Sequence, residues 1–244
     1  MSVAEKLTTI AENEQKVYDA GFKAGQAQGG GSAEDNPFYY ASSLNGCFGG
    51  AVFPENYDLV LRQKQQGSAS GAYTYIFNNC YNLKTVKLIC EEETGKAMSF
   101  ESSFAKANDS ANPSTLETVD LTEFFRTFTN LRIAFQQQTK LKSIYGALDL
   151  SSCTNTTNTF NQCKSLEDVR FEEGTIGIAM AFNHCTKLSA ESYHSIIKGC
   201  SKTAAFTLTH PPETTVRSVY DATYGSGAWD TITAEYSNLT IAYT

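Results

Sequence analysis

A seven-residue pattern that occurs four times constrains the fold of this chain more than any other feature. It consists of a Phe, two residues drawn from Asn, Gln and His, a Cys or Gln, two variable residues and a Leu. The copies span residues 77–83, 135–141, 160–166 and 182–188. A motif that returns at intervals of this size predicts a repeat architecture, in which each unit packs against its neighbours in the chain.

A second element follows the leucine and reads Leu-x-x-Val/Ile-x-Leu/Phe. It is complete in residues 83–88, 116–121 and 166–171, and its first half recurs in residues 141–144. Apolar and polar residues alternate in it, which predicts a short strand with one inward face that lies parallel to the strand of the next unit. The longest step between units carries an insertion, predicted to be the polar stretch from residue 106 to 113.

The Phe, Cys and Leu of the heptapeptide lie three residues apart, a spacing that suits a turn of α- or 3₁₀-helix with one face inward. The Cys occupies an equivalent place in three copies, which indicates a set of small buried side chains rather than reactive thiols. The predicted repeat core consists of Phe77, Cys80, Leu83, Val86, Phe135, Leu141, Phe160, Cys163, Leu166, Val169, Phe182, Cys185 and Leu188.

Residues 1–25 are predicted to form an amphipathic helix that begins with a capping box. Its apolar residues follow heptad spacing, so it is either one helix packed on a neighbour or a short coiled coil that makes the protein a dimer or trimer. The predicted oligomerisation residues are Val3, Leu7, Ile10 and Val17. Residues 26–36 are rich in Gly and predict a flexible linker.

The remaining chain divides into an N-terminal cap at residues 37–71, the repeats at 72–188 and an α/β cap at 189–244. In the last segment, Ser189 is a candidate N-cap for a helix that carries Tyr193, Ile196, Ile197 and Cys200 on one side. A strand from residue 206, a helix over 214–224 and a strand over 239–243 complete the prediction. The fold class is therefore an α/β repeat.

The Phe-x-x-Cys-x-x-Leu-x-x-Val/Ile-x-Leu/Phe units, over about residues 72–190, resemble the BspA-like leucine-rich repeats of bacterial and phage proteins. This resemblance implies an irregular leucine-rich-repeat solenoid with parallel strands and short helical turns. The opening MSVAEKLTTIAENEQKVYDAGFKAG and the later LSAESYHSIIKGC resemble the ends of leucine-rich-repeat proteins of phages and prophages of gut Firmicutes. That second resemblance implies a virion-associated protein of the tail, a fibre or the surface.

Charge and composition argue against several functional classes. A net charge of -7 argues against a nucleic-acid partner. The sequence has no run of 18 apolar residues, so we expect no membrane-spanning segment. The first residues lack the features of a signal peptide, so we expect synthesis in a host cytoplasm. The seven Cys form no CxxC motif, and the three His are not at metal-ligand spacing from them. We therefore expect no disulfide framework, metal or cofactor.

The sequence gives little support for catalytic residues. His184 and Cys185 are adjacent and point different ways, and the carboxylates at 91–93 and 172–173 are typical of solvated loops. We therefore predict a non-enzymatic protein. The candidate ligand-binding residues are instead Tyr73, Tyr75 and Tyr81, of which the first two share a face if residues 72–76 are extended; partly buried packing is the alternative.

The repeats predict a binding protein, and the resemblance of the two ends implies that it is associated with a virion. The N-terminal helix is expected to contact other virion proteins and to oligomerise the chain. The repeat surface is expected to bind a host surface protein or glycan. The alternative is a bacterial cell-surface adhesin or a protein-interaction scaffold of the BspA-like class.

Overall fold

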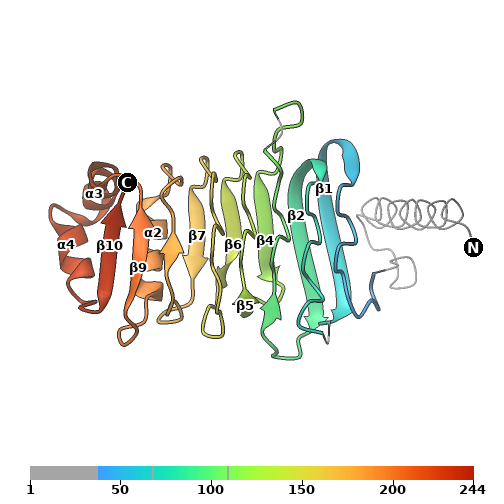
Figure 1. The fold of residues 1–244 in the computed structure, drawn as a ribbon, viewed down its shortest axis with the longest axis horizontal. Helices are drawn as coiled ribbons and strands as arrows, with labels where there is room; N and C mark the ends of the chain where they lie inside the picture. Colours follow the sequence, from blue (N-terminus) through green and yellow to red (C-terminus); the bar gives the residue numbers. More distant parts are fainter. Residues whose placement is uncertain (1–37, 68, 109) are drawn as a thin grey trace, which may run out of the picture.

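The computed structural model describes residues 38–67, 69–108 and 110–244, which form an α/β fold built mainly of parallel strands. The largest sheet has five strands, and its order β1–β2–β4–β6–β7 follows the chain. Every pair of neighbours in this sheet is parallel, so after each strand the chain crosses back to the end of the sheet where the strands begin (Figure 1). The five strands are β1 (Val52–Gln65), β2 (Tyr81–Glu92), β4 (Thr118–Glu123), β6 (Ser143–Leu148) and β7 (Asp168–Phe171).

Smaller elements accompany this sheet. A short pair joins β3 (Met98–Ser99) to β5 (Phe128–Asn130). A three-stranded sheet, β10–β9–β8, lies toward the C-terminal end, where the helices of the described residues also gather (Figure 1). Its strands and the helices are β8 (Met180–Ala181), β9 (Phe206–His210), β10 (Leu239–Tyr243), α2 (Ala190–Gly199), α3 (Glu213–Tyr224) and α4 (Ala228–Thr233).

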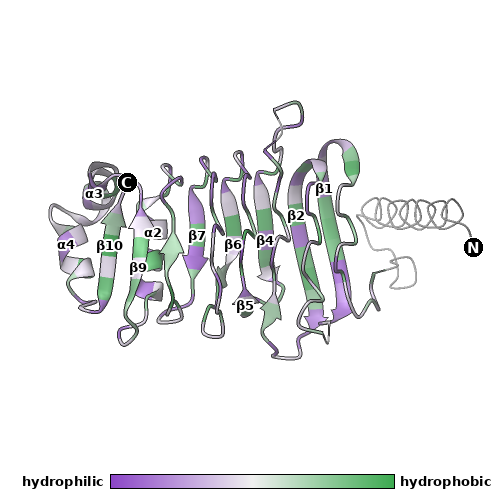
Figure 2. Ribbon diagram, viewed as in Figure 1, coloured by the Kyte–Doolittle hydropathy of each residue, from purple (hydrophilic) through white to green (hydrophobic). Residues whose placement is uncertain are grey.

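One residue from each strand of the large sheet forms a continuous buried row. The register places Leu59 beside Val86, and the row continues through Val119, Ile144 and Val169. Each of these side chains is at most 1% exposed. The alternation predicted for the strand is confirmed, and hydrophobic and hydrophilic bands follow one another along β2, β4 and β6 (Figure 2).

A stack of phenylalanine rings runs through the molecule beside this row. Successive ring centroids are 5.1, 5.1, 5.5, 5.7 and 5.3 Å apart, and the planes of neighbouring rings differ by 4° to 25°. The His210 ring continues the stack 5.9 Å beyond the last phenylalanine. The heptapeptide identifies four of the six stacked phenylalanines; the complete stack is Phe48, Phe77, Phe104, Phe135, Phe160 and Phe182.

The segments around the stacked rings are turns, and the predicted helical or 3₁₀ turn over residues 77–83 is wrong. Tyr75 and Asn79, two residues before and after Phe77, have φ angles of 57° and 56°. Such left-handed residues end any right-handed helix. They also aim alternate N–H groups at the next unit: Tyr75, Phe77 and Asn79 donate to the carbonyls of residues 101, 103 and 105 over 2.7–3.0 Å.

A left-handed backbone conformation is found at the second residue of the polar pair in three copies of the heptapeptide. The residue two after the stacked Phe has a positive φ in four units, where it is Gly50, Asn79, Gln137 or Gln162. Gly adopts this conformation without strain, and Asn does so more readily than most residues. The residue types at this position therefore reflect the left-handed backbone conformation of the turn.

The fourth residue of the heptapeptide is a hydrogen-bond donor to the preceding unit. The thiols of Cys80, Cys163 and Cys185 donate to the carbonyl oxygens of Phe48, Phe135 and Phe160, over 2.8, 3.1 and 3.7 Å. In the unit without a cysteine, the Gln138 amide donates to the carbonyl of Phe104. Either Cys or Gln can occupy this position because the side chain of each donates to a backbone carbonyl of the preceding unit.

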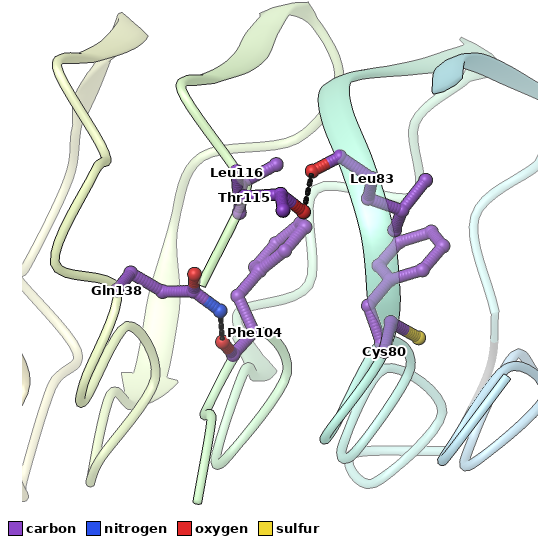
Figure 3. Close-up of a pocket in the computed structure, with 7 residues that line it drawn as sticks. Cys80, Leu83, Phe104, Thr115, Leu116 and Gln138 are labelled. Carbon is purple, nitrogen blue, oxygen red and sulfur yellow. Dashed lines mark hydrogen bonds between the residues drawn. The ribbon is translucent and has the colours of Figure 1, made fainter. Parts of the chain in front are cut away.

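Gln138 also explains why the cysteine-less unit follows the insertion. Its side-chain oxygen accepts a hydrogen bond from Ser114, at the end of the insertion, and Thr115 donates to the Leu83 carbonyl over 2.7 Å (Figure 3). Gln138, Thr115 and Leu83 are among the residues that line a void of about 10 Å³, near the smallest volume that holds a water molecule. The longer amide spans a gap that a cysteine would leave open.

The helix predicted after Ser189 is confirmed as α2, and it covers the edge of β7. The Ser189 hydroxyl accepts the Ser192 N–H over 3.1 Å. The Ser192 and Ser195 hydroxyls in turn accept the N–H groups of Val169 and Phe171 over 3.1 and 2.9 Å. Side-chain oxygens thereby replace the backbone acceptors of a further strand, so the sheet ends without an open edge.

The other C-terminal predictions are confirmed as β9, α3 and β10, whereas α4 is an element that the sequence pattern missed. At the other end, the described part of the predicted N-terminal cap, residues 38–67 and 69–71, contains β1 and the first stacked ring, Phe48. The predicted N-terminal helix and linker, with Val3, Leu7, Ile10 and Val17, lie outside the described residues.

Candidate binding surface

The outward face of the five-stranded sheet displays two rows of side chains. The strand register aligns Asp58, Thr85, Thr118, Ser143 and Asp168 across the sheet in the first row. These small polar groups leave the neighbouring row accessible. The second row is Val60, Lys87, Asp120 and Tyr145.

The second row combines exposed apolar groups at its ends with charges at its centre. Val60 is 36% exposed and Tyr145 is 44% exposed. They lie three strands apart, about 14 Å at the usual strand spacing. Lys87 and Asp120 occupy the two strands between them. An exposed tyrosine and valine flanking polar side chains are typical of protein recognition surfaces.

Charges on this face are largely paired with one another. The Lys87 ammonium lies 3.8 Å from Asp120 and donates to Glu123, which raises the pKa of the lysine. Arg170 lies 2.7 Å from Asp168, and the Thr85 hydroxyl donates to Asp58 over 2.6 Å. Because opposite charges are adjacent, the face presents no strong field of one sign and suits a partner of low net charge.

The three predicted ligand tyrosines do not form one surface. Tyr73 is fully buried; its ring packs on Phe124 and Phe125, and its hydroxyl accepts the Gly67 N–H over 2.6 Å. Burial raises its pKa to about 12. Its assignment as a ligand residue is therefore wrong, and the physical reason is that residues 72–76 form a turn and not a strand.

The other two tyrosines remain at the surface to different degrees. Tyr75 is 44% exposed and lies on the turn, away from the sheet face. Tyr81 begins β2 and is half-buried beneath the Lys106 ammonium, 3.5 Å from the ring centroid. A different tyrosine, Tyr145 of β6, lies outward beside Asp120. Alternation with the buried Ile144 is a sequence signal for its exposure, although not for its alignment with Val60.

The predicted repeat core is buried in the structure. Twelve of its thirteen residues are at most 3% exposed, and Cys80 is half-buried. Burial raises the pKa of the Cys80 thiol to about 12, and it raises the pKa values of Cys163 and Cys185 as well. These sulfur atoms therefore stay protonated at neutral pH and lack the reactivity of a nucleophile.

Glu91 and Glu117 have the electrostatics of ion-paired carboxylates. Glu91 accepts hydrogen bonds from Tyr39 over 2.6 Å and from Arg62 over 2.9 Å, which lowers its pKa. A neighbouring Lys142 ammonium similarly lowers the pKa of Glu117. A general acid requires a raised pKa, so these carboxylates have the opposite electrostatics.

Within the described residues, no group of three or more His, Cys, Asp or Glu side chains is arranged to hold a metal ion. In the same part of the chain, no helix has the length and apolarity needed to cross a membrane. Comparisons with family models, curated proteins and solved structures found no match to the chain.

Proposed function

We propose that this chain is a non-enzymatic binding protein whose repeat units form an irregular leucine-rich-repeat solenoid. The in-register row from Leu59 to Val169 and the stacked rings from Phe48 to Phe182 support this architecture. Five units contribute one residue each to the row, these five and the unit of Phe182 contribute one ring each to the stack, and no unit buries its apolar face alone.

The observation that carries the binding role is the outward row Val60–Lys87–Asp120–Tyr145. The described residues include six exposed large apolar side chains, and two of them, Val60 and Tyr145, lie in this row at 36% and 44% exposure. The rigid sheet beneath fixes their separation, so little conformational entropy is lost when a partner binds. We assign recognition of a host surface protein or glycan to this face.

A non-enzymatic role is supported by the chemistry of the buried and paired groups. The thiols are protonated, and the carboxylates described above have lowered pKa values. Neither set resembles an activated nucleophile or a proton donor.

The setting that we propose is a phage virion, as the resemblance at the two ends of the sequence implies. The predicted N-terminal helix would attach the chain to other virion proteins as a dimer or trimer. Several copies of the sheet face would then act together, and a linked set of weak contacts raises the overall affinity well above that of one contact.

The binding role is tested by flow cytometry with the labelled full chain on a panel of gut Firmicutes cells. The double variant Val60→Glu/Tyr145→Glu introduces two charges on the face, and Tyr40→Glu, on a tyrosine that is 74% exposed elsewhere, is the matched control. We expect the double variant to lose binding and the control to keep it. Equal binding by all three proteins would contradict the assignment.

Light scattering tests the oligomeric part of the proposal. The full chain is expected to be a dimer or trimer, and a chain without residues 1–25 is expected to be a monomer. A monomeric full chain would contradict the role given to Val3, Leu7, Ile10 and Val17, while leaving the sheet face untouched.

A further inference from the structure

A groove of about 370 Å³ lies between the C-terminal helices, away from the sheet face. α2 contributes His194 and Lys198 to one side, and residues on and after α4, among them Thr231 and Glu235, form the other. The end of α3 supplies Tyr220 and Tyr224. The volume falls within the range of about 300–1,000 Å³ that is usual for small-molecule sites.

Three rings form an aromatic wall in this groove. The Tyr220 and Tyr224 centroids are 4.6 Å apart, and the His194 ring lies 5.2 Å from Tyr224. Nδ1 of His194 is 2.8 Å from the Tyr220 hydroxyl, which fixes both rings. Tyr220 is 2% exposed, whereas Tyr224 is 43% exposed. The wall therefore has a rigid base and one ring that faces solvent.

The rim beside Tyr224 is held in place by a neighbouring carboxylate. Asp221 accepts the N–H groups of Gly227 and Trp229 over 3.2 and 2.9 Å, which fixes the turn between α3 and α4. Gly225 and Gly227 have φ angles of 104° and 76°, and these angles allow the tight connection. The groove is thus shaped before a ligand arrives, which lowers the entropic cost of binding.

The polar groups of the groove balance one another. The Lys198 ammonium lies 2.9 Å from the Glu235 carboxylate, so the two charges that line the groove cancel. Burial and the nearby Lys198 lower the pKa of His194, so its ring is neutral at neutral pH. The Ser226 and Thr231 hydroxyls complete a lining rich in hydrogen-bonding groups. A charged ligand finds no uncompensated partner there.

We propose that this groove is a binding site for a neutral carbohydrate, with one sugar ring stacked on Tyr224. The C–H groups on one face of a sugar ring carry slight positive charge and suit the negative face of an aromatic ring. The sugar hydroxyls can both donate and accept, as the ion pair and the hydroxyls of the groove require. An apolar ligand would displace water from those groups without replacing its hydrogen bonds, and an ionic one would have to break the pair.

The site is separate from the sheet face of the proposed function, so either assignment can fail alone. The first experiment applies the full chain to an array of neutral, sialylated and sulfated oligosaccharides. We expect binding to neutral glycans. The absence of any bound glycan, or binding restricted to anionic ones, would overturn the proposal.

Calorimetry with a bound neutral oligosaccharide then locates the site. Tyr224→Ala is expected to weaken binding about tenfold or more, as for a central aromatic contact. Tyr224→Phe keeps the ring and is expected to stay within about threefold of the original affinity, since it loses at most one hydrogen bond. Tyr40→Ala is the control for an exposed tyrosine elsewhere. Circular dichroism checks folding, and unchanged affinity in a folded Tyr224→Ala protein would overturn the proposal.

Discussion

Replacing Phe104 by Ala tests whether the ring stack holds the units together. Phe104 is fully buried, and its ring lies 5.1 Å from Phe77, 5.5 Å from Phe135 and 5.6 Å from Phe100. Removing a buried phenylalanine ring usually costs about 3–5 kcal/mol in the free energy of unfolding, and less where the surroundings collapse into the space.

Collapse is restricted at this position. The two stacked neighbours are each held by their own units. A void of about 10 Å³ stays open beside Phe104 even with the ring in place, so the surrounding side chains do not close small gaps here. We therefore expect a loss near the upper limit, about 4–5 kcal/mol. For a chain of this size each kcal/mol lowers the melting temperature by about 2–4 °C, so a fall of roughly 8–20 °C is expected.

Urea unfolding followed by circular dichroism measures this loss, with a thermal scan as a second readout. Tyr40→Ala, at an exposed site, is the control and is expected to change stability by no more than about 0.5 kcal/mol. A loss below about 1.5 kcal/mol for Phe104→Ala would refute the view that each stacked ring joins two units.

Three further predictions follow from the buried polar groups. Because burial raises their pKa values, the Cys163 and Cys185 thiols are expected to resist a thiol reagent at pH 8 until urea unfolds the chain; rapid labelling of these two in the folded protein would contradict this. Burial lowers the pKa of His210 to about 3, so between about pH 3 and 6.5 the unfolded chain binds a proton that the folded chain does not, and stability is lost as the pH falls through this window. His210→Phe should flatten that pH dependence in urea titrations, and an unchanged slope would show that other groups cause it. Gln138→Ala is expected to cost about 1–3 kcal/mol and to speed hydrogen exchange in residues 110–116, because the Phe104 carbonyl and the Ser114 hydroxyl lose their partner; unchanged exchange would contradict the tethering role.

The strands were predictable because their pattern is direct. Val86 and Leu88 alternate with polar residues, and the structure buries both in a parallel sheet. Helix α2 was equally predictable from the sequence, since a capping serine precedes a pattern of apolar residues on one side. The Ser189 cap is observed. In each case a local signal and the tertiary packing agree.

Two stack positions were missed because their units lack the polar and sulfur-bearing residues of the motif. Phe48 is followed by Gly-Gly-Ala, and Phe104 by Ala-Lys-Ala, so only the ring remains of the pattern. His210 at the end of the stack belongs to no heptapeptide. Backbone hydrogen bonds between units can hold a ring in the stack without the other motif side chains, and such bonds leave no pattern in the sequence.

The candidate surface was the least predictable part. Tyr73 was expected outward on the assumption of an extended segment, whereas left-handed residues turn the chain there and bury it. Tyr145 was overlooked, since its importance depends on alignment with Val60 across strands far apart in the sequence. Register between strands, more than the composition of any one strand, determines which side chains form a surface.

Site-specific photo-crosslinking on bound cells tests whether the outward face of the sheet contacts the partner. A photoreactive benzoylphenylalanine is placed at Tyr145 on the sheet face or at Tyr40 as the control, in the full chain, and irradiated on cells that bind it. We predict one crosslinked cell-surface partner from position 145 and none from position 40. Equal crosslinking from both positions, or crosslinking from position 40 alone, would contradict recognition by the outward face of the sheet.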